Sequence, residues 1–210
     1  MKCKFCGEKI TPFMSFGEMP MANGFLKKQD FKKEFFFKLE VGFCKKDFLF
    51  QINNHPHSPH IFNNKYPFYT EKSQHMIDHF KSYFKWIKSN FLKKNSKVIE
   101  IGSNDGTFLN YFKKSNVEHL GIEPSSNVAK YSRKKGVKVL SKFFCYKEVK
   151  KLRKYKNSTD VICAANVICH IPDINDLIKS VDFLLSDRGV FIFEEPYLGS
   201  MFKRTSYDQI

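Results

Sequence analysis

Apolar strand-like segments alternate with helix-like segments over the second two thirds of the sequence, and this alternation constrains the fold more than any other feature. The strand-like segments are rich in Val, Ile and Leu. We expect strands at 97–101, 119–123, 137–140, 160–165 and 189–194, with helices that begin near 106, 125, 147 and 173. Continuous apolar strands that alternate with helices are typical of a parallel sheet covered on both faces. The sequence therefore predicts an α/β fold.

The residues before this region divide into one helix and one segment without a long helical period. Apolar residues that recur every three or four positions predict a helix from Gln74. Residues 1 to about 65 are instead rich in Phe, Lys, Asn and His. So short a segment buries little apolar surface by itself, and a bound metal is a usual stabiliser. We expect a small module at 1–65 and a larger domain at 74–210.

The charge of the chain bears on its partners. The sequence has 36 Lys and Arg against 21 Asp and Glu, which gives a net charge of +15, and such a charge favours phosphate-rich partners. Only four of the basic residues are Arg, and the Lys residues are scattered, whereas a nucleic-acid reader usually concentrates Arg on one face. The sequence therefore disfavours a nucleic-acid partner. No apolar run reaches the roughly 18 residues that span a bilayer, so we expect no membrane partner and a cytoplasmic protein.

The strand expected at 97–101 ends in a glycine turn, Gly102–Gly106, that leads into a helix. Free N–H groups and the positive helix end at such a turn bind nucleotides. A phosphate-binding P-loop would continue with Lys and Ser or Thr, but Thr107 and Phe108 follow here. A dinucleotide fingerprint would have Gly in place of Asn104. The turn therefore disfavours nucleoside triphosphates and NAD(P).

What remains is the pattern Glu-x-Gly-x3-Gly, from Glu100 to Gly106, followed by Glu123 at the end of the next expected strand. A carboxylate in that place accepts both hydroxyls of a ribose. Gly102 lets the backbone approach a ligand, and Asp105 places an anion near a cation. These features suit a positively charged nucleoside without phosphate, namely S-adenosylmethionine. In the alternative interpretation, the glycines only turn the chain and Glu123 only caps a helix.

With these residues the chain resembles the class I methyltransferases and, more closely, the sugar C-methyltransferases that act on nucleotide-linked ketosugars. The resemblance rests on “EIGSNDGTFLNYF”, “GIEPSSNVA”, “ANVICHIPDINDLI” and “GVFIFEEPYL”, and it runs from residue 3 to residue 208. It implies a zinc-binding module followed by a Rossmann-like parallel-sheet methyltransferase domain. It also implies a nucleotide-linked sugar as substrate, methylated through an enolate. The implied contacts with S-adenosylmethionine involve Glu100, Gly102, Asn104, Asp105, Gly106, Glu123 and Asn166.

The resemblance extends to the N-terminal cysteines. The family carries a Cys-x2-Cys pair and a second cysteine pair that bind zinc, and this chain has Cys3, Cys6 and Cys44. Asp47 stands in place of the fourth Cys, and zinc accepts a carboxylate oxygen, so these four residues can close a tetrahedral Zn²⁺ site. A histidine of “HPHSPH” as fourth ligand, and free thiols without metal, are the alternatives. The three cysteines after residue 140 lie in apolar stretches and are predicted to be reduced core thiols.

The implied chemistry needs a base for the α-proton of the ketone and a partner for the enolate oxygen. His170 follows the fourth expected strand, at the edge of the sheet where open α/β folds bind ligands. The family has an active-site His at this place, which makes His170 the first catalytic candidate. Tyr66 and Tyr69 resemble an aromatic segment that lies near the substrate in the family, and core packing is their alternative role.

The sequence departs from the family at its end. The family continues into a segment that resembles F-D-x-I-Y-H-E-H, with Tyr, Glu and His for proton transfer, and this chain stops at Ile210. A cofactor-binding but catalytically incomplete fragment is therefore the alternative function. An RNA-binding methyltransferase is a further alternative, favoured only by the charge and the zinc module.

Overall fold

The computed structural model describes residues 1–206, which form two compact units. The first unit contains residues 1–61, 171–174 and 196–206, and the second contains 62–170 and 175–195. The first unit therefore takes residues from both ends of the described chain. The sequence-based division into 1–65 and 74–210 stays a prediction.

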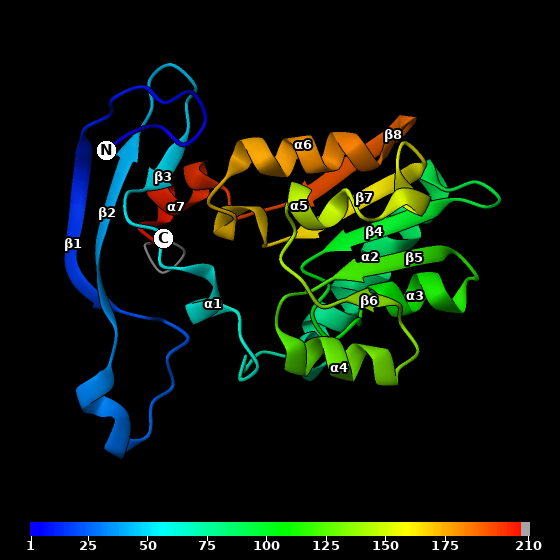
Figure 1. The fold of residues 1–210 in the computed structure, drawn as a ribbon, viewed down its shortest axis with the longest axis horizontal. Coiled ribbons are helices and arrows are strands. Elements are labelled where there is room, and N and C mark those ends of the chain that lie inside the picture. Colours follow the sequence, from blue (N-terminus) through cyan, green and yellow to red (C-terminus); the bar gives the residue numbers. More distant parts are fainter. Residues whose placement is uncertain (207–210) are drawn as a thin grey trace. The chain divides into compact units, whose positions relative to one another are not determined.

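The second unit is built on a five-stranded parallel sheet with the strand order β6-β5-β4-β7-β8 (Figure 1). Its strands are β4 (Lys97–Ile101), β5 (Glu118–Ile122), β6 (Val139–Leu140), β7 (Thr159–Ala165) and β8 (Leu185–Glu194). The predicted parallel sheet is confirmed, and all five strands lie where the apolar segments indicated. The last strand begins earlier than expected, at Leu185 instead of Gly189.

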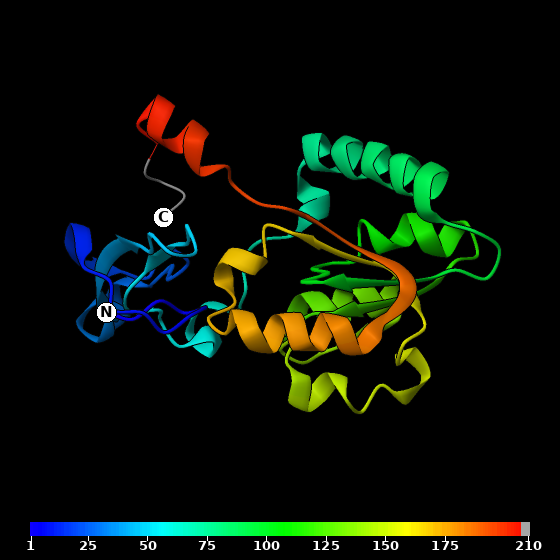
Figure 2. The ribbon, with the colours of Figure 1, turned by 90° about the horizontal axis from the view of Figure 1, so that it is seen from above.

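One helix precedes β4, a helix follows each of the strands β4, β5, β6 and β7, and together these helices cover the sheet. They are α2 (Gln74–Phe91), α3 (Leu109–Lys114), α4 (Ser126–Lys134), α5 (Tyr146–Val149) and α6 (Ile174–Leu184), with the 3-10 turns η2 (Thr70–Lys72), η3 (Arg153–Tyr155) and η4 (Ile168–His170). Figure 2 shows α2 and α3 on one side of the sheet and α5 and α6 on the other. The prediction of a sheet covered on both faces is therefore confirmed, as is the helix that begins at Gln74.

An aromatic core joins α2 to α3. Phe80, Phe84 and Ile87 recur on one face of α2 and are buried. The ring of Phe80 stacks on Phe108 with centroids 4.9 Å apart, and Phe84 meets Phe112 edge-on at 4.9 Å. Aromatic pairs of this kind add to the free energy gained from burying their surface. The helical spacing seen in the sequence therefore marks the face that packs on the sheet domain.

The first unit contains a three-stranded antiparallel sheet with the order β1-β2-β3. Its strands are β1 (Pro12–Pro20), β2 (Phe36–Phe43) and β3 (Phe50–Ile52), and its short helices are η1 (Lys28–Lys33), α1 (Ser58–Ile61) and α7 (Leu198–Arg204). Its small buried cluster consists of Cys3, Ile10 and Cys44. In residues 1–206 no helix is both long enough and apolar enough to cross a bilayer.

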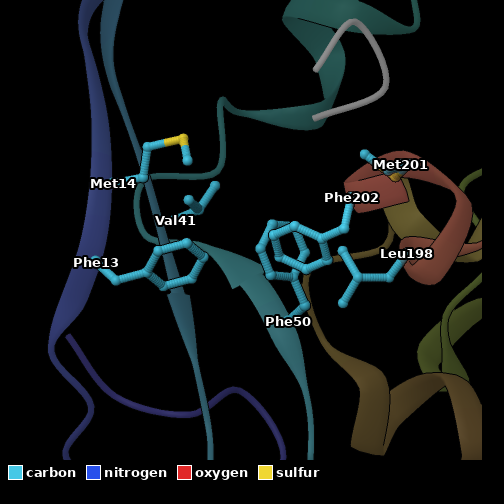
Figure 3. A pocket seen from close by; sticks show the side chains of 7 residues that line it. All are labelled: Phe13, Met14, Val41, Phe50, Leu198, Met201 and Phe202. Carbon is cyan, nitrogen blue, oxygen red and sulfur yellow. The ribbon is translucent and has the colours of Figure 1, made fainter. Parts of the chain in front are cut away.

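An apolar hollow lies between the sheet of the first unit and α7 (Figure 3). The ring of Phe50 on β3 meets Phe202 on α7 edge-on, with centroids 6.4 Å apart. This contact joins α7 to the sheet of the first unit. The other apolar side chains that line the hollow include Phe13, Val41, Leu198 and Met201.

The three cysteines after residue 140 differ in burial. Cys163 on β7 is buried, and burial raises the pKa of its thiol well above the usual value. Cys145 is only partly buried and Cys169 is exposed. The prediction of a core thiol is therefore confirmed for Cys163 and wrong for Cys169, because Cys169 lies in the surface loop after β7, beyond the apolar strand.

Candidate cofactor and metal sites

The glycine turn follows β4 in the middle of the sheet, with β5 on one side and β7 on the other. Connections leave this point in opposite directions, and open parallel sheets bind ligands at such a point. Gly102 has φ +69° and Gly106 has φ +76°, a region that side chains rarely adopt. A Cβ on Gly102 would also lie 2.3 Å from Cγ2 of Val167. The chain can therefore make this turn only with glycine at position 102.

Glu123 follows β5 at the same edge and is 4% exposed. One carboxylate oxygen accepts the N–H of Asn104 at 2.9 Å, and the other accepts the N–H of Ser125 at 2.7 Å. Burial raises the pKa of Glu123, and these two hydrogen bonds oppose that effect. A carboxylate has about four acceptor positions, so both oxygens can still accept from a ribose. Glu123 thus joins the two loops that border the site and fits its predicted role.

Glu100, on β4, is buried, and its Oε2 has no hydrogen-bond partner in the described part of the chain. Burial raises the pKa of Glu100 well above its usual value, and the nearby charges of Asp105 and Glu123 raise it further. An unpaired buried polar atom costs free energy. A cationic group of a ligand would relieve that cost, so this carboxyl fits S-adenosylmethionine.

Asp105 is fully buried, and protein donors use both of its oxygens. Oδ1 accepts the backbone N–H of Thr107 at 3.0 Å and its hydroxyl at 2.6 Å. Oδ2 accepts the N–H of Glu71 at 2.9 Å, and the Lys135 ammonium lies 3.7 Å from Oδ1. In this structure Asp105 holds η2 against the glycine turn. Contact between Asp105 and a ligand cation stays a prediction.

The two predicted tyrosines lie on the segment that leads into η2. Asn127 on α4 donates from Nδ2 to the backbone carbonyl of Tyr66 at 2.8 Å and to the Tyr69 hydroxyl at 3.2 Å. Asn104 in the glycine turn donates to the carbonyl of Phe68 at 3.2 Å. Partial burial raises the pKa of Tyr66, and the charge of Glu123 adds to this effect. Both tyrosines therefore lie beside the candidate cofactor site.

Asn166 and His170 lie in the loop after β7, at the same carboxyl edge of the sheet. Asn166 has φ +54°, and its N–H donates to the carbonyl of Glu194 at 2.9 Å. The ring of His170 meets Phe62 edge-on, with centroids 5.6 Å apart. His170 is exposed as a residue, yet neighbouring groups desolvate its ring enough to lower its pKa, while the charge of Glu195 opposes this shift.

The structure thus places all of the residues predicted for the cofactor and for catalysis at one edge of one sheet or on the segment beside it. The roles of the individual residues stay predictions. Glu71, Asn127 and Lys135 support the site and were not predicted from the sequence. Their partners lie far away in the sequence, 34 residues for Glu71 and 61 for Asn127, so no local motif marks them.

The predicted zinc ligands converge in the first unit. The ligand atoms of Cys3, Cys6, Cys44 and Asp47 all lie within 4.8 Å of one another. Oδ2 of Asp47 is 3.4 Å from the sulfurs of both Cys3 and Cys44, and the sulfurs of Cys6 and Cys44 are 3.9 Å apart. Zinc–sulfur bonds of about 2.3 Å in a tetrahedron separate two sulfurs by about 3.8 Å. The four residues therefore fit a zinc ion.

Asp47 fits the fourth position better than a histidine does. Within residues 1–206, these four residues form the only group of three or more Cys, His, Asp or Glu side chains close enough to hold a metal ion. The histidines of “HPHSPH” do not join it. This arrangement favours Asp47 over the histidines as the fourth ligand.

Comparison with known families and proteins agrees with this geometry. Residues 73–209 match a family described as a methyltransferase domain, and residues 3–62 match a zinc binding domain. The chain is 26% identical over 212 residues to the C-methyltransferase NovU of Streptomyces niveus, in a match that covers 100% of this chain and 50% of NovU. It is 36% identical over 85 residues to the carboxy-S-adenosyl-L-methionine synthase of Nautilia profundicola. This match covers 38% of this chain and 33% of that protein. The chain thus spans half or less of the length of these relatives.

Solved structures show the same fold. The PH0226 protein from Pyrococcus horikoshii matches with a TM-score of 0.55 and 20% identity, over 70% of this chain and 69% of that chain. A SAM-dependent methyltransferase from Archaeoglobus fulgidus matches with a TM-score of 0.51 and 16% identity, over 61% of this chain and 58% of that chain. The prediction of a Rossmann-like sheet domain that follows a small zinc-binding module in the sequence is confirmed.

Proposed function

Because this chain belongs to the methyltransferase-domain family, we propose that it transfers the methyl group of S-adenosylmethionine to a carbon atom of a nucleotide-linked ketosugar. The family confirms the predicted class of enzyme and its cofactor, and the match of residues 3–62 confirms zinc binding. The similarity to a C-methyltransferase along the whole chain supports carbon as the acceptor atom. The sugar substrate is supported by the sequence segments that resemble sugar C-methyltransferases.

The observation that carries the proposal is the pair of buried carboxyls at the central switch point of the sheet. Glu123 retains acceptor positions for ribose hydroxyls while it accepts the N–H groups of Asn104 and Ser125. Glu100 has a buried oxygen without a partner among the described residues, next to Gly102, where the backbone can approach a ligand. The cofactor, when bound, supplies an electrophilic methyl group. These residues bind and orient it.

His170 is the candidate for the proton chemistry. A lowered pKa keeps most of its imidazole neutral at pH 7, as a general base requires. It would take the α-proton of the ketone and leave an enolate, whose carbon would attack the methyl group while the bond from that methyl group to sulfur breaks and S-adenosylhomocysteine leaves. Tyr66 and Tyr69, beside the site, are candidates for contact with the substrate. Their hydroxyls can donate hydrogen bonds to an oxyanion.

One alternative has a specific observation in its favour. The match covers only 50% of NovU, so further residues outside this chain can take part in the reaction of that protein. In this alternative the chain binds the cofactor and does not complete methyl transfer by itself. Both functions predict cofactor binding, and they differ in turnover.

Calorimetric titration of the zinc-loaded chain with S-adenosylhomocysteine tests the cofactor site. We expect micromolar binding that is lost in Glu123→Ala. Glu118→Ala is the matched control because Glu118 lies at the start of β5, at the opposite end from Glu123, and pairs there with Lys154. A folded chain that shows no binding would contradict the methyltransferase function.

A second measurement separates the two functions. A nucleoside-diphosphate ketosugar is incubated with the chain in D2O, and loss of its α-proton signal is followed by NMR with and without S-adenosylmethionine. Exchange followed by methylation supports the sugar C-methyltransferase. Cofactor binding without exchange or methylation supports the incomplete fragment.

A further inference from the structure

Glu195 follows β8, and its carboxylate faces the loop after β7. Its Oε1 accepts the backbone N–H of Val167 at 2.8 Å and that of Ile168 at 2.7 Å. Its Oε2 is buried and has no hydrogen-bond partner among the described residues. Hydrogen bonds from N–H groups to a charged carboxylate are roughly twice as strong as those between neutral groups. One side chain therefore fixes two consecutive peptide groups of this loop.

These hydrogen bonds determine the conformation of the loop that carries His170. The N–H of Asn166 donates to the carbonyl of Glu194, so the end of β8 holds three successive N–H groups. Asn166 takes a left-handed conformation, with φ +54°, and the 3-10 turn η4 then runs from Ile168 to His170. Without Glu195, the backbone from Asn166 to His170 would lose its main tether to the sheet.

Glu195 is also the charged neighbour of the His170 ring. The phenyl ring of Phe62, which comes from the segment before α2, meets the His170 ring edge-on and carries no charge. Cys169 precedes His170 in the chain, and desolvation of its sulfur together with a hydrogen bond to Glu195 raises the pKa of its thiol. The carboxylate of Glu195 favours the protonated imidazole, while desolvation disfavours it. The balance between these two effects determines the charge of His170.

We propose that Glu195 is a positioning residue, which holds the loop from 166 to 170 against β8 and supplies the negative charge that tunes His170. The effect of Glu195 on catalysis rests on the proposed function of His170. Its structural role in holding the loop does not depend on that function. Glu195 acts through His170 and through the loop backbone. The adjacent Glu194 points elsewhere, with its carboxylate oxygens 2.9 and 3.1 Å from Nε2 of His79.

The test is an NMR titration of the His170 ring in the full, zinc-loaded chain, with the signal assigned from its disappearance in His170→Gln. Glu195→Gln keeps an oxygen that accepts both N–H groups but removes the charge, so we expect the pKa of His170 to fall. Glu194→Gln is the matched control and leaves that pKa unchanged. An unchanged pKa of His170 in Glu195→Gln would overturn the electrostatic part of the proposal.

Amide hydrogen exchange tests the positioning part. Glu195→Ala removes a charged acceptor, and hydrogen bonds to charged groups are stronger than those between neutral groups. We expect exchange at Val167 and Ile168 to become at least about tenfold faster, with smaller changes in Glu195→Gln. Unchanged exchange in a folded Glu195→Ala variant would overturn this part. Neither readout requires turnover or a sugar, so failure of the proposed reaction would leave both results interpretable.

Discussion

The two compact units use the same residue types for opposite purposes. In the second unit, phenylalanines such as Phe108 and Phe112 are 2% and 0% exposed and form the core with α2. In the first unit, Phe25 and Phe48 are 74% and 76% exposed, and the buried cluster contains two cysteines of the metal site. Abundant Phe therefore does not by itself make a core. Where too few helices and sheets pack together to bury the apolar side chains, a bound metal stabilises the fold instead.

Of all the changes considered, removal of zinc should produce the largest difference in stability between the two units. Structural zinc contributes about 10–16 kcal/mol of binding free energy in zinc-finger peptides, which is as large as the whole stability of an ordinary domain, about 5–15 kcal/mol. After treatment with a chelator, we expect the amide signals of the first unit to lose their dispersion while those of the parallel sheet persist. NMR spectra of the full chain, before and after chelation, measure this.

Cofactor binding supplies the control for zinc removal. Titration with S-adenosylhomocysteine after chelation should give the same affinity, because Glu100, Gly102 and Glu123 all belong to the second unit. Cys44→Ser should mimic the chelator, whereas Cys163→Ser, on β7, should not. Loss of cofactor binding on chelation would show that the second unit also depends on the metal, and would contradict the expectation that only the first unit needs zinc.

Truncation of a core aromatic in the second unit should give the next largest effect. Phe112→Ala removes a fully buried ring that contacts Phe84 and Phe108, and such changes cost about 3–5 kcal/mol. Phe48→Ala removes a ring that is 76% exposed, and we expect a change within about 0.5 kcal/mol. Urea unfolding of both variants measures the difference. Similar losses in both would mean that Phe48 is covered in solution.

Acidification should act on the second unit through His119. This residue is 6% exposed, its Nδ1 lies 2.9 Å from the Val117 carbonyl, and burial lowers its pKa. Below the unfolded pKa of about 6.5, the unfolded chain binds a proton that the folded chain does not. Stability therefore falls as pH drops through 6.5 toward the lower folded pKa, by at most about 1.4 kcal/mol per pH unit.

Urea unfolding at several pH values, monitored on the second unit, measures this slope. His119→Gln should flatten it, and His75→Gln is the matched control because His75 is exposed on α2. An unchanged slope in His119→Gln would show that another buried group carries the acid sensitivity.

The same comparison shows what the sequence could and could not predict. The parallel sheet and α2 were predictable because their apolar periodicity reflects burial on one face or on both. In the first unit, β1 was not predicted, since its two ends are Pro12 and Pro20 and Gly17 interrupts it with φ +75°. The clearest sequence signal of the first unit was the cysteine spacing, because metal ligands need a fixed geometry and little surrounding core.

The candidate site was predictable to the same limited extent. Gly102 and Glu123 stand in recognisable positions because a tight turn needs glycine and a ribose needs a carboxylate at a strand end. The actual partners of Asp105 and the role of Glu195 were not predictable. They depend on how η2 and β8 come to lie beside loops that are distant in the sequence, and no local pattern records such contacts.

Loss of a helix cap should give the smallest change in unfolding free energy, and this change should be confined to the second unit. The Ser73 hydroxyl accepts the N–H of Met76 at 3.3 Å at the start of α2, which is the longest helix in the described chain. Replacement of such a cap by Ala costs about 1 kcal/mol. We expect Ser73→Ala to lower the unfolding free energy of the second unit by this amount, as measured by urea unfolding, and to leave zinc affinity unchanged.

Ser89→Ala on the same helix is the matched control for this substitution. The Ser89 hydroxyl donates to the carbonyl of Lys85 at 2.9 Å and lies on the exposed side of α2. Ala favours the helix interior more than Ser does, so this variant should be as stable as the parent or slightly more stable. If Ser73→Ala also changed nothing, the start of α2 would be held by its tertiary contacts alone. Core packing would then stabilise α2 near both of its ends, at Ser73 and at Ser89, more than these hydroxyl groups do.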